Sequence, residues 1–126
     1  VESEQYFGPA RLARRVVQKL SLTALARTEL RTAVDASSGR SARTVYGGHE
    51  HLLRQTVIAL RAGEMLNEHE NPGEATVQVL SGRVTLTAGD VSWSGWTGDL
   101  ITIPDARHSL TADEDSAVLL TVVKHR

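Results

Sequence analysis

The strongest constraint on the fold is a series of short apolar segments, separated by glycine turns, that fills roughly the last two thirds of the chain. Apolar and polar residues alternate within the segments, as is typical of half-buried β-strands. Strands are expected at residues 42–46, 52–60, 75–80, 84–88, 91–96, 100–103, 109–112 and 117–124. Many short strands at even spacing, with tight turns such as Gly89-Asp90 between them, predict an all-β sandwich or barrel.

The first forty residues have a helical periodicity instead. Apolar residues at helical spacing predict one helix over residues 9–20, with arginines on its other side. Ser21 can cap a second helix, whose apolar stripe would consist of Leu22, Leu25, Leu30 and Val34. We therefore expect a helical leader over residues 1–40 and a β-barrel over residues 41–126. The stripe must be buried, either on a sheet of the barrel or against a second subunit.

Two spaced motifs lie within the β-rich part. Their glycines, proline and histidines are Gly63, His69, Gly82, Gly98, Pro104 and His108. The spacing resembles the two signature motifs of the cupin family, G-x5-H-x-H-x3,4-E-x6-G and G-x5-P-x-G-x2-H. The resemblance covers about residues 42–124 and is strongest to the small single-domain bacterial cupins. It implies a double-stranded β-helix, the jelly-roll form of a β-barrel.

The resemblance also implies a site at the mouth of the barrel. In the family, three histidines and one glutamate converge there and hold a divalent metal. His69 and His108 match two of these histidines, whereas Asn71 stands at the position of the other histidine and Ala75 at that of the glutamate. Ala106 replaces the inner glycine of the second motif. The site is therefore expected to be a degenerate or remodelled version of the family's metal site.

Glu74 offers one way to complete a metal site. It lies one residue before Ala75, and Pro72-Gly73 could support a β-bulge that turns its side chain inward. His69, His108 and Glu74 would then form a two-histidine, one-carboxylate set for iron, with nickel, manganese and zinc as alternatives. Strict alternation, in contrast, places Glu74 on the face opposite Ala75.

Two neighbouring residues on the strand before the first motif are assigned to opposite faces. Gln55 is expected inside the barrel, and Arg54 outside, because an unpaired buried guanidinium is costly. The expected ligand pocket consists of Gln55, His69, Asn71, Ala75 and His108. His49 and His51 also have metal-ligand spacing, but they lie at a hairpin end, which favours a solvated turn.

Composition narrows the range of partners and reactions. The net charge of -1 gives no reason to expect a nucleic acid or a membrane surface as a partner. The chain has no cysteine, which excludes disulfides and thiolate chemistry. It also lacks a nucleophile elbow, a phosphate loop and a dinucleotide fingerprint. We expect a cytoplasmic protein that forms a homodimer.

Two functions from different classes stay open at this point, and with them whether the protein is an enzyme. The first is a binding or sensing module that takes a small polar molecule into the barrel. The second is a metal-dependent oxygenase, isomerase or epimerase that acts on a small polar substrate. A third interpretation is an interaction protein whose basic leader binds a partner, although interspersed acids favour a solvated helix face.

Overall fold

The computed structural model describes residues 17–69 and 73–124, which form one helix and nine strands. These are α2 (Leu22–Asp35), β1 (Arg40–Tyr46), β2 (Leu53–Leu60), β3 (Met65–His69), β4 (Gly73–Ser81), β5 (Arg83–Ala88), β6 (Val91–Trp96), β7 (Leu100–Thr102), β8 (His108–Ala112) and β9 (Ser116–Lys124). The all-β class is confirmed, and eight strands lie within one or two residues of their predicted bounds. The ninth strand, β3, carries part of the first motif and was not predicted as a strand.

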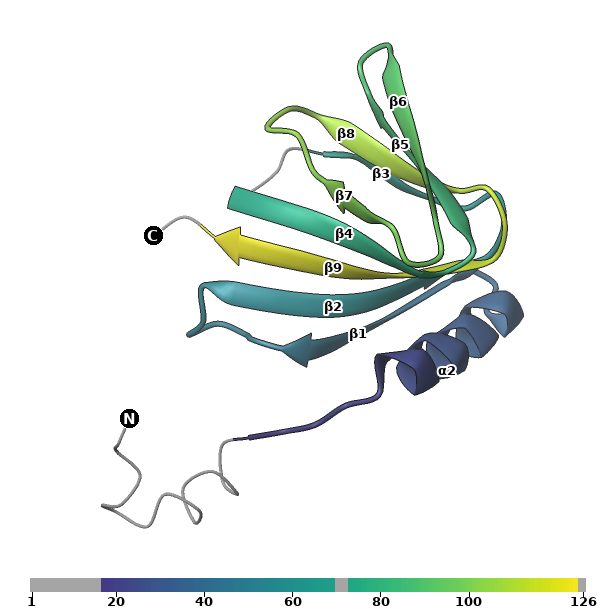
Figure 1. The fold of residues 1–126 in the computed structure, drawn as a ribbon. Helices are drawn as coiled ribbons and strands as arrows, with labels where there is room; N and C mark the ends of the chain where they lie inside the picture. Colours follow the sequence, from purple (N-terminus) through teal and green to yellow (C-terminus); the bar gives the residue numbers. More distant parts are fainter. Residues whose placement is uncertain (1–16, 70–72, 125–126) are drawn as a thin grey trace.

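The strands form two antiparallel sheets that face each other (Figure 1). The five-stranded sheet has the order β1-β2-β9-β4-β7, and the four-stranded sheet has the order β3-β8-β5-β6. The chain changes sheet at six of its eight connections, and only β1–β2 and β5–β6 join neighbours within one sheet. The last change, from β8 to β9, places β9 between β2 and β4, as in the double-stranded β-helix expected from the motifs.

Apolar side chains from both sheets fill the space between them. The buried cluster consists of Val77, Val79, Val84, Leu86, Leu110 and Val118, and Ile58, Leu66, Ile101, Ile103 and Leu120 pack against it. Burial of one such side chain contributes about 1.5–3 kcal/mol. Successive residues of a strand point to opposite faces. The strand residues in this cluster therefore face inward, and their direct neighbours along each strand face outward. The body of the barrel is therefore apolar and filled.

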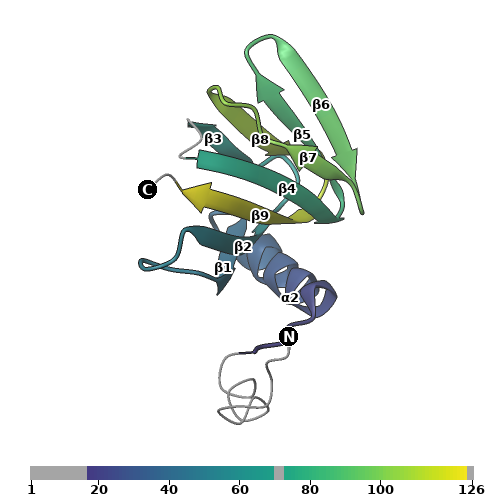
Figure 2. The same cartoon turned by 60° about the vertical axis from the view of Figure 1, so that its left-hand side comes forward.

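Helix α2 covers part of the outer face of the five-stranded sheet (Figure 2). Ser21 caps it as predicted, since its hydroxyl accepts a hydrogen bond from the Ala24 amide at 3.2 Å. The helix buries Ala26 and Ala33, which pack on Ala59 and Ala117 of the sheet. Small side chains at this contact let the helix lie close to the strands. Of the two possibilities left open for this helix, the structure therefore shows the first: it packs on a sheet of its own barrel.

The buried face of α2 differs from the predicted stripe. Glu29 is buried in it, and the Ser41 hydroxyl of β1 donates a hydrogen bond to the Glu29 carboxylate. Val34, by contrast, is exposed. The reason is that a polar partner on β1 and small neighbours on the sheet favour this rotation of the helix over one that buries the largest side chains.

The other predicted helix, over residues 9–20, falls mostly outside the described residues, and its last four residues, 17–20, are not helical. They form an extended segment that leads into α2 (Figure 1). Within the described part of the chain, no helix is long and apolar enough to cross a bilayer.

The motif glycines Gly63, Gly82 and Gly98 all have a positive φ, of 90°, 90° and 94°. Gly82, in the turn between β4 and β5, is also held against β9. A Cβ atom there would lie 2.3 Å from Oγ of Ser116 and 2.4 Å from the carbonyl oxygen of Asp115. The motif therefore requires glycine at this position for both conformation and space.

Gly82→Ala is expected to lower the free energy of unfolding by more than about 2 kcal/mol, because the alanine would be strained and would collide with β9. Urea denaturation measures this change. Gly89→Ala is the matched control, since Gly89 has a φ of 62° and a Cβ there would meet nothing within 4 Å. Its cost is expected to be about 1 kcal/mol. Equal losses in the two variants would show that the contact with β9 is unimportant.

Candidate functional site

The two motif histidines occupy opposite positions on neighbouring strands at the mouth of the barrel. Strand β3 ends at His69, strand β8 begins at His108, and the two residues are Cα partners. The register set by Leu66 and Leu110 would instead pair Glu68 with His108. A shift between Leu66 and His69 inserts one residue into β3, as a β-bulge does. This irregularity brings His69 opposite His108.

His108 is a buried side chain with a defined orientation. It is 5% exposed and lies two residues from Leu110, a member of the barrel core, so it faces the interior. Its Nδ1 lies 2.9 Å from the carbonyl oxygen of Ala106. A carbonyl oxygen can only accept, so Nδ1 carries the proton, and in the neutral ring Nε2 carries the lone pair. The backbone before β8 thus presents Nε2 as an acceptor or a metal-binding nitrogen.

Strand β4 places Ala75 inside and Glu74 outside. It pairs with β9 without irregularity from Gly73 to Val79, with Ala75 opposite Val122 and Glu74 opposite Val123. Because Val77 and Val79 belong to the core, alternation puts Ala75 on the inner face and Glu74 on the outer face. Glu74 is exposed. The prediction that the Glu74 side chain turns inward was therefore wrong, because the pairing of β4 with β9 is regular from Gly73 to Val79.

Strand β2 reverses the predicted faces of Gln55 and Arg54. Its register with β9 is regular from Leu53 to Leu60, and Ile58 packs in the barrel core while Ala59 packs under α2. Gln55 therefore lies on the outer face, where its Nε2 donates to Oγ1 of Thr121 at 3.1 Å. The placement of Gln55 inside the barrel was wrong. Arg54 lies on the inner side.

Arg54 is the residue of the mouth that sequence reasoning missed. Val122 of β9 pairs with Arg54 on one side and with Ala75 on the other. The three residues therefore form one row across the inner face of the sheet, where Arg54 is exposed at the barrel end. The sequence did contain a signal for the facing of Arg54. It lies four residues before the apolar Ile58, and residues an even number apart share a face of a strand.

The donors at the mouth fall short of the family's metal site. Among the described residues, no three His, Asp or Glu side chains lie close enough together to hold a metal ion. His108 supplies one imidazole, Ala75 supplies no donor, and Glu74 lies on the other face. The side chain of His69 and the whole of Asn71 lie outside the described part of the structure. Catalytic metal sites usually have three protein ligands, and the described residues alone do not supply them.

Comparisons with known proteins agree with this fold. No protein-family model and no curated protein matches the sequence. A solved structure of a conserved protein of unknown function from Streptococcus pyogenes is 30% identical, with a TM-score of 0.65, and the match covers 72% of this chain and 79% of that one. A cupin superfamily protein from Desulfitobacterium hafniense has a TM-score of 0.68 at 15% identity, over 86% of this chain and 92% of that one. KdgF from Halomonas sp. has a TM-score of 0.60 at 20% identity, over 73% and 86%.

The fold and its two motifs define a jelly-roll barrel protein with paired histidine positions at the mouth. Its fold is that of a cupin superfamily protein, the Desulfitobacterium hafniense structure, with which it shares 15% sequence identity. The matched structures support this fold and do not specify an activity.

Restoring a carboxylate at position 75 should improve metal binding. Ala75→Glu is expected to raise the affinity for Mn²⁺ or Zn²⁺ by about tenfold or more, because it adds an oxygen donor on the inner face of the five-stranded sheet, and His108 lies on the inner face of the other sheet. Competition with a fluorescent chelator measures this affinity. Glu74→Ala is the control and should leave the affinity unchanged. A loss of metal binding in Glu74→Ala would contradict the strand register described above.

Proposed function

We propose that this protein binds a small polar molecule at the mouth of its barrel, as a binding or sensing module whose family metal site is degenerate. The observation that carries the proposal is a change of charge at the mouth. An alanine, Ala75, stands at the family's acidic position, and a guanidinium, Arg54, lies in the same row of the inner face. The position where the family has a metal-binding carboxylate therefore carries none here, and a positively charged side chain lies in the same row.

The histidines supply hydrogen-bonding groups in this proposal. The Ala106 carbonyl orients the His108 imidazole, and we assign this ring to hydrogen bonding with a ligand hydroxyl or amide. His69 is the Cα partner of His108 and matches a histidine of the first motif. We therefore include His69 in the proposed pocket. Asn71, two residues further along, would add a neutral donor and acceptor.

The guanidinium of Arg54 favours a ligand that carries an anionic group. Guanidinium groups form paired, charge-assisted hydrogen bonds with carboxylates and phosphates. The exposed position of Arg54 keeps its charge hydrated while no ligand is bound, so the apolar barrel below does not have to bury it. The ligand class is therefore a small molecule with a carboxylate or phosphate and at least one hydroxyl or amide.

Metal content tests the first part of the proposal. Protein purified without a histidine tag is expected to contain less than a stoichiometric amount of iron, nickel, manganese or zinc by elemental analysis, because too few donors are present. The His69→Ala and His108→Ala variants should have the same low content. Near-stoichiometric metal that disappears in both variants would overturn the proposal and favour a metal-dependent enzyme.

Anion binding tests the second part. Inorganic phosphate and malonate, used as simple probes in isothermal titration calorimetry, are expected to bind the wild type, and Arg54→Gln should weaken binding by about tenfold to a hundredfold. Arg43→Gln is the matched control, because Arg43 pairs with Val57 and lies on the outer face of β1. Arg43→Gln should not change the affinity. Equal effects of the two substitutions would indicate general electrostatic attraction and contradict a site at the mouth.

A further inference from the structure

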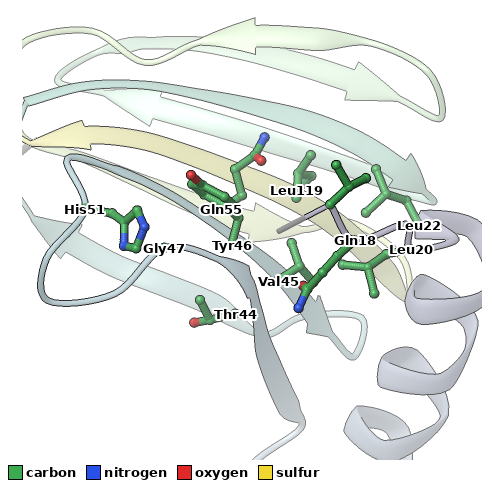
Figure 3. A pocket seen from close by; sticks show the side chains of 11 residues that line it. Gln18, Leu20, Leu22, Thr44, Val45, Tyr46, Gly47, His51, Gln55 and Leu119 are labelled. Atoms are coloured by element: carbon green, nitrogen blue, oxygen red, sulfur yellow. The ribbon is translucent and has the colours of Figure 1, made fainter. Parts of the chain in front are cut away.

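A second hollow lies on the other side of the five-stranded sheet, away from the barrel. Helix α2 packs on the outer face around Ala59 and Ala117, and beyond this contact Gln55 and Leu119 line a groove. The extended segment before the helix crosses this part. Between the segment and the sheet lies a groove of about 650 Å³ (Figure 3). Volumes of about 300–1,000 Å³ are typical of small-molecule sites.

The polar groups of this groove are held in place by the surrounding structure. Gln55 donates through Nε2 to Thr121, which orients the amide and leaves its Oε1 as an acceptor. The ring of Tyr46 meets that of His51 edge to face, with centroids 5.3 Å apart and planes at 70°. The turn that carries His51 is closed by a hydrogen bond from its amide to the Gly48 carbonyl, at 3.2 Å. These groups are therefore preorganised.

A β-bulge brings Tyr46 into the groove. Thr44 pairs with Thr56, and unbroken register would then pair Val45 with Gln55. The shift between Thr44 and Tyr46 instead pairs Tyr46 with Gln55. An aromatic ring and an oriented amide thus lie side by side on the outer face. Bulges are common next to sites because they redirect one side chain in this way.

The lining of the groove indicates the kind of ligand. Its apolar walls come from Leu20 on the crossing segment, Leu22 at the start of α2 and Leu119 on β9, which Figure 3 shows at one end of the groove. No Asp, Glu, Lys or Arg lines the groove among the described residues. A charged ligand would lose part of its hydration there without an Asp, Glu, Lys or Arg side chain as a partner, whereas an uncharged ligand has no such cost.

We propose that this groove is a second binding site, for an uncharged amphipathic small molecule. An apolar ring or chain of the ligand packs on Leu20, Leu22 and Leu119. A ligand hydroxyl or amide donates a hydrogen bond to Oε1 of Gln55, beside the Tyr46 ring. The site is separated from the barrel mouth by the sheet itself, so it does not depend on the function proposed above.

Binding of N-phenyl-1-naphthylamine, an uncharged fluorescent probe, tests the proposal on the full chain. Saturable binding to one site is expected. Leu20→Arg, which adds a charge to the wall, and Gln55→Ala, which removes the acceptor, should each weaken probe binding by about tenfold or more. Leu20 is 45% exposed, so its substitution leaves the core intact. Leu100→Arg, at a site 64% exposed on the distant strand β7, is the control and should bind like the wild type.

Circular dichroism confirms that each variant is folded before the titration. Wild-type affinity in both groove variants, or an equal loss in Leu100→Arg, would overturn the proposal. Absence of saturable binding to the wild type would also overturn it. Light scattering provides a further test: a dimer that excludes the probe as it forms, and that Leu20→Arg disrupts, would assign the groove to a second copy of this chain.

Discussion

The antiparallel pairing of β9 with both β2 and β4 is the interaction on which the other features depend. It is regular along β2 and along β4 from Gly73 to Val79, so one strand determines the facing of two others. Val118 on the inner side belongs to the barrel core, and Leu119 on the outer side lines the groove. The same pairing places Arg54 in one row with Ala75. Both proposed sites therefore depend on the register of a single central strand.

Two β-bulges adapt this regular frame to binding. The bulge in β3 brings His69 opposite His108 at the mouth, and the bulge in β1 brings Tyr46 opposite Gln55 in the groove. In each case one inserted residue changes which residue is paired with an oriented polar residue. The body of the barrel between them is lined by apolar side chains. Arg54 and Ala75, in contrast, lie in regular pairing with β9, so the mouth combines regular and irregular positions.

The two sites differ in the ligands that they favour. Arg54 and His108 at the mouth combine a positive charge with an oriented acceptor, which suits a small polar anion. The groove has oriented neutral groups and leucine walls, which suits an uncharged molecule. The five-stranded sheet lies between them. Alanine contacts under α2 hold the helix against that sheet at one end, and the groove begins where the helix contact stops.

Local sequence patterns were sufficient for eight of the nine described strands, for the Ser21 cap and for the two motifs, because alternation, glycine conformation and capping act over a few residues. They also identified His108 and the loss of the acid at Ala75. Alternation alone, however, defines two faces without saying which is inside, so Gln55 and Arg54 were assigned to the wrong sides. Pairing across the sheet settled that choice, placed the bulges and excluded Glu74. These features depend on partner strands far away in the chain, and only the tertiary structure brings those strands together.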